Sequence, residues 1–349
     1  MSKIPVGVLG ATGAVGQRFV QLLADHPWFE IVELAASDRS AGKPYREACT
    51  WRLATLLPET AAARVVKTCE GPFESKILFS GLDSSVAGEI ETALAGRGHA
   101  VVSNSRNHRM DPDVPLLIPE VNPEHLEALA VQRKRTGGGY IVTNPNCSVV
   151  GLAMALAPLQ RAFGLQEVAV VTLQALSGAG YPGVASMDIA DNVIPYIGGG
   201  EEEKIETEPL RILGSFTAGS FQPAPFTISS SVHRVAVGDG HTMAVFARLK
   251  LKSTPERAVE ALAEFRGEPQ QRRLPTAPQR PIHVLPQADR PQPRLDRDRE
   301  GGMAVSVGRV RGDRTFDLRF EVLVHNTIRG AAGAAILNAE LLKARELLP

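Results

Sequence analysis

The stretch IPVGVLGATGAVGQRFVQLLA, at residues 4–24, decides the fold of the first part of the chain. Alternating apolar residues at its start predict a β-strand over residues 4–9, and an amphipathic pattern predicts a helix over residues 18–24. The turn between them carries three glycines, Gly10, Gly13 and Gly16. A strand, a glycine-rich turn and a helix in this order are typical of a dinucleotide-binding α/β domain.

Short buried strands are predicted further along, at residues 31–36, 76–79, 99–102 and 141–142. Their alternation with helical segments predicts a parallel sheet with helices on both faces. We therefore expect an α/β fold with a Rossmann-type domain over residues 1–147. A helix of small and apolar residues is predicted over residues 328–348, and residues 328–349 are expected to rejoin this domain.

The second half of the chain has a different pattern. Strands are predicted at residues 167–176, 233–237, 243–251, 303–310 and 316–324, the last two as an antiparallel pair. Residues 267–301 are rich in Pro, Arg and Gln with little periodicity, and we interpret them as an extended excursion because strand patterns resume afterwards. Residues 148–327 are thus predicted to form an α+β domain of mainly antiparallel sheet.

Composition excludes several classes of protein. The 349 residues are 44% hydrophobic and 22% charged, with 38 basic and 38 acidic side chains, so no global charge favours nucleic acid or a membrane surface. The beginning of the sequence has no apolar signal core, and we expect a cytoplasmic protein. Three cysteines without paired spacing fit neither a disulfide framework nor a zinc site, and no metal is expected.

The glycine turn predicts a cofactor site. Its spacing is G-x-x-G-x-x-G, which meets the usual dinucleotide fingerprint only in part, and glycines that serve packing alone are the alternative. The turn after the second strand holds Ser37, Asp38, Arg39 and Ser40. One arginine and two hydroxyls suit a 2′-phosphate and favour NADP, whereas Asp38 is either a ribose ligand or a solvated turn residue.

One of the three cysteines stands in a reactive setting. Cys147 lies in the turn NPNCS directly before a predicted helix, where the helix dipole is expected to lower the thiol pKa. For Cys49 and Cys69, a buried unreactive thiol is the better interpretation. Among eight histidines, His241 is the candidate base because it lies in the tight turn GDGHT before a strand, although a histidine near a turn is often only a surface residue.

Seven segments together resemble one enzyme family. They are GATGAVG, SNSRNHRM, NPNCS, QALSGAGYPG, EEEKIETEPLRIL, HRVAVGDGHT and HNTIRGAAGA. The chain resembles the aspartate-β-semialdehyde dehydrogenase family, in its archaeal and fungal-like branch, from the first glycine turn to the last helix. The resemblance implies NADPH-dependent reductive dephosphorylation of β-aspartyl phosphate through a cysteine thioester.

The resemblance also implies roles for individual residues. Cys147 would be the nucleophile, His241 the acid/base and Gln174 the group that orients the intermediate. Arg234 would bind the substrate α-carboxylate, with a strand-edge ion pair to Asp239 as the alternative. Glu208 would hold the α-amino group or brace Arg234.

The leaving phosphate calls for cations. Arg109 matches one of the family's phosphate-binding residues, and Arg211 corresponds best to the second, where the family often carries lysine. Lys204 is a weaker candidate, because it is flanked by glutamates that would pair with it.

The expected cofactor contacts extend over both domains. They comprise Gly10, Thr12, Gly13, Ala14, Val15, Ser37, Arg39, Ser40, Ser80, Gly81, Ser177, Gly178, Ala179 and Asn326. For Ser80 and Gly81 a plain strand-end turn is a serious alternative.

The resemblance further implies that residues 148–327 form a catalytic and dimerisation domain, in a homodimer or homotetramer that acts on small molecules and inorganic phosphate. Two other functions stay open at this point. A malonyl-CoA reductase uses the same scaffold on a different acyl substrate, and a catalytically inactive NADP-binding protein is an alternative from a different class. The intact set of Cys147, His241, Arg234 and Gln174 speaks against the second.

Overall fold

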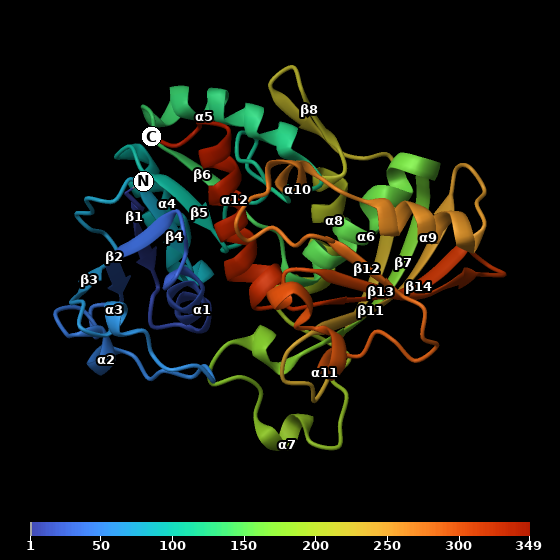
Figure 1. Ribbon diagram of the computed structural model, residues 1–349, viewed down its shortest axis with the longest axis horizontal. Coiled ribbons are helices and arrows are strands. Elements are labelled where there is room, and N and C mark those ends of the chain that lie inside the picture. Colours follow the sequence, from blue (N-terminus) through green and yellow to red (C-terminus); the bar gives the residue numbers. More distant parts are fainter. Residues whose placement is uncertain (1) are drawn as a thin grey trace.

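The computed structural model describes residues 2–349, which form two domains side by side, each built on a six-stranded sheet (Figure 1). The first sheet has the order β3-β2-β1-β4-β5-β6, and all its strands are parallel. Its strands are β1 (Ile4–Leu9), β2 (Phe29–Ala36), β3 (Val66–Thr68), β4 (Ile77–Ser80), β5 (Ala100–Ser103) and β6 (Tyr140–Thr143).

The order of this sheet reverses at β1, because the chain runs outward through β2 and β3 and then crosses to β4 on the other side. Crevices at such reversal points, beyond the carboxyl ends of the strands, are where α/β sheets bind nucleotides. The covering helices are α1 (Ala14–Leu23), α2 (Tyr45–Ala48), α3 (Glu59–Ala62), α4 (Ser84–Gly96), η1 (Pro123–Ala128) and α5 (Leu129–Thr136). Because helices cover both faces, β4, β5 and β6 are buried along their whole length, as parallel strands commonly are.

The C-terminal segment packs against the first domain. It begins with a π-helical turn, η4 (Ile328–Ala332), and continues as α12 (Gly333–Ala344). Figure 1 shows α12 in red between the two domains, where it contacts α1 and β5. The predicted helix over residues 328–348 was therefore too long at its C-terminal end and missed the change of helical type at its start.

The second sheet has the order β10-β7-β11-β14-β13-β12. The pairs β10–β7 and β12–β13 are parallel and the other three are antiparallel, so the sheet is mixed. Its strands are β7 (Leu165–Gln174), β10 (Thr227–Arg234), β11 (His241–Leu249), β12 (Ile282–Leu285), β13 (Val305–Gly312) and β14 (Leu318–Val324), and β8 (Ser215–Thr217) with β9 (Ser220–Gln222) forms a separate hairpin.

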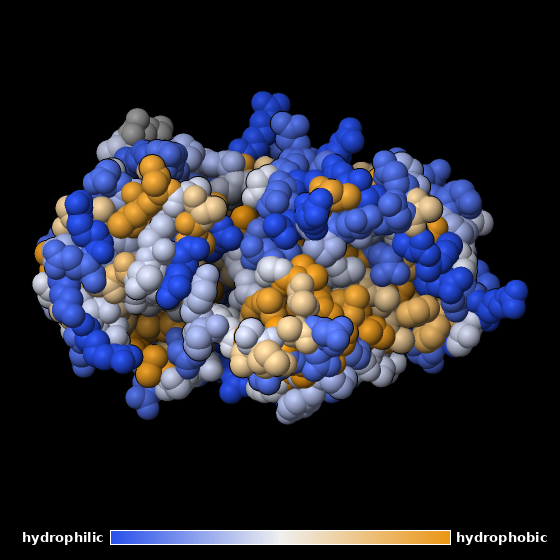
Figure 2. All heavy atoms as spheres, turned by 90° about the horizontal axis from the view of Figure 1, so that it is seen from below, coloured by the Kyte–Doolittle hydropathy of each residue, from blue (hydrophilic) through white to orange (hydrophobic). Residues whose placement is uncertain are grey.

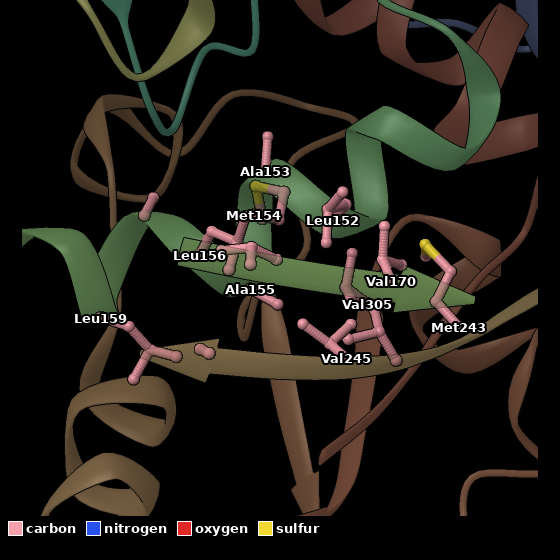
Figure 3. Close-up of a cluster of buried hydrophobic side chains, with 14 of the residues drawn as sticks. Leu152, Ala153, Met154, Ala155, Leu156, Leu159, Val170, Met243, Val245 and Val305 are labelled. Carbon is pink, nitrogen blue, oxygen red and sulfur yellow. The ribbon is translucent and has the colours of Figure 1, made fainter. Parts of the chain in front are cut away.

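Helices cover one face of the second sheet. The helices of this domain are α6 (Cys147–Phe163), η2 (Leu176–Ala179), α7 (Ser186–Ile189), α8 (Glu201–Ile212), α9 (Pro255–Glu264), α10 (Glu268–Arg272), α11 (Pro293–Asp296) and η3 (Arg299–Gly302). Figure 3 shows side chains of α6, such as Leu152 and Leu156, above Val170 of β7 and Val245 of β11. Each fully buried side chain of this kind contributes about 1.5–3 kcal/mol, so this cluster fixes α6, and with it Cys147, firmly on the sheet.

Two strand predictions in the second domain were wrong. The strand expected at residues 233–237 is in fact β10, which begins at Thr227 and leaves the sheet after Arg234, and its serine-rich centre hid the alternation. The excursion at residues 267–301 contains β12, which pairs in parallel with β13. No helix among residues 2–349 has the length and hydropathy to cross a membrane.

Candidate active site

The predicted nucleophile lies where the two domains join. β6 of the first sheet ends at Thr143, and α6 of the second domain begins at Cys147. The Asn146 side chain caps this helix by accepting hydrogen bonds from the N–H groups of Ser148 at 2.9 Å and Val149 at 3.4 Å. Gly330 of η4 packs so closely that a Cβ there would lie 2.9 Å from Cβ of Cys147. The cysteine is therefore held from both sides.

Three adjacent strands of the second sheet carry further predicted residues, and these residues all lie at the same end of the strands. Gln174 ends β7, Arg234 ends the neighbouring parallel strand β10, and His241 begins the antiparallel strand β11. Gln174 and Arg234 are direct partners in the register of these strands. The sheet thus brings together residues that lie far apart in the sequence.

Cys147 and His241 form a close pair. Sγ of Cys147 lies 3.2 Å from Nε2 of His241, and the imidazole is fully buried. Its other nitrogen, Nδ1, accepts a hydrogen bond from the N–H of Ala175 at 3.0 Å. A thiol and an imidazole at this distance form the arrangement that nucleophilic cysteine catalysis requires.

The electrostatics of the pair correct one expectation from the sequence. Cys147 keeps partial solvent access, yet desolvation by the surrounding protein, together with the negative Glu201, raises its thiol pKa to about 12. Arg109 and Arg234 act in the opposite direction but do not prevail. Burial, followed by the nearby Arg234, lowers the pKa of His241 to about 3. The N–H of Ser148 at the helix start does lower the thiol pKa, but burial and Glu201 outweigh it, so the net direction is opposite to the one predicted from the sequence.

Arg234 is available for an anion beside this pair. It is 6% exposed, and its Nη1 donates to the Ala175 carbonyl at 2.7 Å, so its hydrogen bond goes to the backbone and not to Asp239. Gly178 lies against both groups, because a Cβ on it would be 2.9 Å from Nη1 of Arg234 and 3.1 Å from Cε1 of His241. The loop over residues 177–179 therefore borders the cysteine site.

A residue outside the predicted set, Glu201, lies at the centre of the polar contacts. At the start of α8, its carboxylate accepts from Asn146 Nδ2 at 2.8 Å and from Gln174 Nε2 at 3.1 Å, and it pairs with Lys204 Nζ at 3.2 Å. The segment EEEK was noticed in the sequence, but three consecutive glutamates gave no means of choosing among them.

Glu208 has a different partner from the one expected. Its carboxylate pairs with Nη1 of Arg109 at 2.8 Å and accepts the N–H of Asn146 at 2.7 Å. The alternative that Glu208 braces Arg234 was therefore wrong, because this carboxylate is already paired with Arg109. Glu208 instead connects the loop that carries Arg109 to the peptide directly before Cys147.

The two candidates for the second phosphate cation differ in their contacts. Arg211 donates to the carbonyl oxygens of Met110 at 3.3 Å and Val114 at 2.9 Å and to that of Asp111, and its guanidinium lies 3.8 Å from the centre of the Phe221 ring. These bonds tie it to the backbone of the loop after Arg109. Lys204, in contrast, is bound to Glu201 beside Asn146 and Gln174.

The glycine turn has the shape of a phosphate cradle. Gly10 adopts φ +70°, and a Cβ on it would lie 2.7 Å from the carbonyl oxygen of Gly81, so the turn after β1 and the turn after β4 touch. Gly13 caps α1, and Ala14 begins it with no acidic residue in the first turn. The N–H groups at this helix start, Thr12 to Val15, suit a pyrophosphate. These residues fit a dinucleotide.

The remaining cofactor candidates divide into two groups. Ser37 and Arg39 are exposed at the end of β2, and Ser40 is half-buried in the same turn. Ser80 is fully buried, and its hydroxyl donates to Glu91 at 2.6 Å, so its side chain points into the domain and Gly81 alone faces the glycine turn. The structure thus favours the plain structural interpretation for Ser80.

Asn326 connects the predicted nicotinamide loop to the histidine turn. Its Nδ2 donates to Ser177 Oγ at 2.8 Å, and its Oδ1 accepts the N–H of Gly240 at 2.9 Å. The loop that ends with Ala179 is therefore linked through Asn326 to the residue preceding His241.

A dinucleotide-type domain joined to a mixed-sheet domain, with a cysteine and a histidine paired at the junction, defines an oxidoreductase that works through a cysteine. The chain is 52% identical to the aspartate-semialdehyde dehydrogenase of Methanothermobacter thermautotrophicus. The aligned region covers 97% of this chain and 99% of the relative. The chain belongs to the aspartate-semialdehyde dehydrogenase family.

Other relatives agree over the whole chain. The aspartate-semialdehyde dehydrogenase of Schizosaccharomyces pombe is 48% identical over 98% of this chain and 99% of its own. The crystal structure of the Candida albicans enzyme with NADP superposes with a TM-score of 0.92 at 46% identity, over 99% of this chain and 100% of the other. Family models described as semialdehyde dehydrogenase, NAD binding domain and dimerisation domain, match residues 5–129 and 156–329.

Proposed function

We propose that this chain catalyses the NADPH-dependent reductive dephosphorylation of L-4-aspartyl phosphate to L-aspartate 4-semialdehyde, a step in lysine, threonine and methionine biosynthesis. The observation that carries the proposal is the 3.2 Å contact between Cys147 Sγ and His241 Nε2 in a chain 46–52% identical to aspartate-semialdehyde dehydrogenases. No feature of the described residues favours malonyl-CoA or an inactive protein.

Cys147 is the nucleophile in this proposal. Its sulfur attacks the acyl carbon of the aspartyl phosphate, a C–S bond forms, and the C–O bond to phosphate breaks with its electron pair on the departing phosphate. Reduction of the thioester then breaks the C–S bond and releases the aldehyde. His241, whose Nε2 lies 3.2 Å from the sulfur, is proposed as the acid/base that takes the proton of the thiol as the C–S bond forms.

Arg234 and Glu201 are proposed to recognise the amino-acid end of the substrate. The substrate carries an α-carboxylate and an α-ammonium, which need a cation and an anion close together. Burial lowers the pKa of Arg234 and the negative charges of Cys147 and Glu201 raise it, so the guanidinium of Arg234 and the carboxylate of Glu201 lie near the same sulfur. A guanidinium binds a carboxylate through two parallel hydrogen bonds. We transfer the ammonium-binding role from Glu208 to Glu201, because Glu208 is engaged with Arg109.

Arg109 and Lys204 are proposed to bind the phosphate. Arg109 is fixed by Glu208 and the Asn104 carbonyl, and its charge lowers the pKa of Cys147, so it lies near the sulfur. We favour Lys204 over Arg211 as the second cation, since the bonds of Arg211 to three carbonyls indicate a structural role.

The glycine turn, the turn with Ser37 to Ser40 and the loop at residues 177–179 are proposed to hold NADP. When bound there, NADPH supplies the hydride that reduces the thioester. The chain's contribution is to orient the cofactor. The N–H groups at the start of α1 would face its pyrophosphate, Arg39 would bind its 2′-phosphate, and Asn326 with Ser177 would border its reactive end.

The molecule is proposed to be a cytoplasmic homo-oligomer, built at least as a homodimer through residues 148–327. The open face of the second sheet supports this, because Val171 and Leu173 of β7 are 37% and 42% exposed. Figure 2, viewed from the side of α7, shows apolar side chains gathered over the second domain and a hollow between the two domains. A second copy of this chain would cover that sheet face, and light scattering on the purified protein distinguishes dimer from tetramer. We keep residues 1–147 with 328–349 as the cofactor domain.

The direct test is a spectrophotometric assay of the reverse reaction. Aspartate semialdehyde, NADP and inorganic phosphate are expected to give NADPH, and omission of phosphate is expected to stop steady-state turnover. Malonyl-CoA with NADPH is run in parallel. Turnover of malonyl-CoA without any turnover of aspartate semialdehyde would overturn the proposed substrate while leaving the thioester chemistry intact.

A further inference from the structure

The loop that carries Arg109 docks on helix α4 of the first domain. Gly88 of α4 leaves room for this loop, because a Cβ there would lie 2.9 Å from Nδ2 of Asn107. The same Nδ2 donates to the carbonyl oxygen of Ser84 at 3.0 Å. His108, the residue directly before Arg109, reaches the same helix with its Nε2 3.2 Å from the Gly88 carbonyl oxygen. The proposed phosphate ligand is therefore attached to α4 through the two residues that precede it.

Beside this contact lies Glu91, a carboxylate of α4 that has no role in the proposed reaction. It is fully buried, and its Oε1 accepts from Ser80 Oγ at 2.6 Å and from Ser103 Oγ at 2.7 Å. Its Oε2 has no hydrogen-bond partner among residues 2–349 and lies 3.9 Å from Nε2 of His108. A buried charge is unfavourable unless it is paired, so this carboxylate needs a cation nearby.

His108 is placed to be that cation. Its Nδ1 lies 2.8 Å from Oδ2 of Asp111, and its Nε2 faces the Gly88 carbonyl oxygen and Glu91. A neutral imidazole has one N–H, whereas the imidazolium donates from both nitrogens and satisfies the acceptors on both sides. Burial raises the pKa of Glu91, whereas its two serine hydrogen bonds and the charges of His108 and Arg109 lower it. The carboxylate therefore interacts with both neighbouring cations of the loop.

We propose that Glu91 and His108 are positioning residues that hold the Arg109 loop in place for phosphate binding. The inference rests on the proposed function, in which Arg109 binds the phosphate. Glu208 and the Asn104 carbonyl fix the guanidinium itself. Glu91 and His108 act one step earlier in the chain of contacts, because they fix the backbone from which the arginine side chain projects.

A through-space effect of the Glu91 charge would have the opposite sign. Glu91→Gln keeps an acceptor for the two serine hydroxyls and removes the negative charge. Loss of a negative charge near Arg109 would by itself strengthen the binding of an anion. Loss of the contact that orders the loop weakens anion binding, because part of the binding free energy is then used to order the loop. The direction of the change in phosphate affinity therefore separates the two effects.

Calorimetric titration of the NADP-loaded enzyme with inorganic phosphate is the test. Glu91→Gln and His108→Ala are each expected to weaken phosphate binding about tenfold and to leave NADP binding unchanged. The His108 side chain is 12% exposed, so His108→Ala is expected to fold even if Glu91→Gln does not. Because Glu91 acts through His108, the double variant should bind phosphate as weakly as His108→Ala and no more weakly. The matched control is Glu340→Gln, which changes an equally buried carboxylate bonded to Nε2 of His26 at 2.7 Å and should not affect phosphate binding.

Three results would overturn the proposal. They are unchanged or tighter phosphate binding in His108→Ala or in a folded Glu91→Gln, additive losses in the double variant, and an unmodified enzyme that does not bind phosphate. An equal loss of NADP affinity in both variants would also overturn it, because the effect would then be a general loss of structure. The titration contains no aspartate semialdehyde, so a failure of the proposed function appears separately, as absent turnover in the unmodified enzyme.

Discussion

Replacement of Arg234 by leucine tests the substrate site most sharply. The guanidinium is 6% exposed and is fixed by the Ala175 carbonyl at 2.7 Å, so an incoming α-carboxylate meets a positioned and shielded cation. A hydrogen bond to a charged group contributes about 1.5–3 kcal/mol, and a bidentate contact makes two. Leucine should therefore cost about 3 kcal/mol or more in transition-state binding, roughly a hundredfold in kcat/KM.

The assay is steady-state oxidation of aspartate semialdehyde with NADP and phosphate, together with direct measurement of NADP binding. Arg234→Lys is the matched variant, because it keeps the charge but loses the planar pair of donors, and about a tenfold loss is expected. NADP binding should be unchanged in both. Normal kcat/KM in the two variants would refute the reasoning and would direct attention to another acyl substrate.

Four further predictions follow from the site. Cys147→Ala should fold and bind NADP yet lose turnover by several orders of magnitude, and activity near that of the unmodified enzyme would exclude the thioester. Arg39→Ala should raise the KM for NADP and leave the KM for NAD almost unchanged, as initial rates with each cofactor will show; an enzyme that already prefers NAD contradicts this. Lys204→Met should raise the KM for phosphate about tenfold or more without affecting NADP binding, and an unchanged KM would return the role to Arg211. Glu91 accepts hydrogen bonds from Ser80 and Ser103 at the ends of β4 and β5 and lies near the loop that carries Arg109. Glu91→Ala should therefore lower Tm and also raise the KM for phosphate. Glu340→Ala, which removes an equally buried carboxylate remote from that loop, should lower Tm alone.

Local patterns were sufficient to predict the first domain. β1, the glycine turn and α1 follow one another within residues 4–23, and short apolar strands such as β4 and β5 are bounded by polar turns. β12 was not predictable in the same way. It occurs in a segment rich in Pro and Arg that is held by the ion pairs of Asp296 with Arg290 and Arg299, and its partner β13 lies beyond that segment in the sequence.

The candidate site was predictable where a local turn carries the chemistry and not where tertiary contacts assign the partners. Glu201, Lys204, Glu208 and Arg211 are spaced three or four residues apart, so they lie on one face of α8. The sequence therefore indicated the face, but only the folded chain determines that Glu201 contacts Gln174 and Glu208 contacts Arg109.

The thiol pKa of Cys147 likewise depends on tertiary contacts that the sequence does not reveal. Position before a helix is a local feature of the sequence, and it suggested a lowered pKa for Cys147. Desolvation and the negative Glu201 arise only on folding, and they raise that pKa to about 12. Arg109 and Arg234 act in the opposite direction and favour the thiolate form.

The central claim is a thioester on Cys147, and mass spectrometry of the acylated protein tests it most directly. The enzyme is mixed with aspartate semialdehyde and NADP without phosphate, quenched in acid, and digested. The account predicts an aspartyl acyl group on the peptide that contains Cys147, released when phosphate is added and absent from Cys147→Ala. NADPH formation with no adduct on this peptide, or with the adduct on another residue, would contradict it.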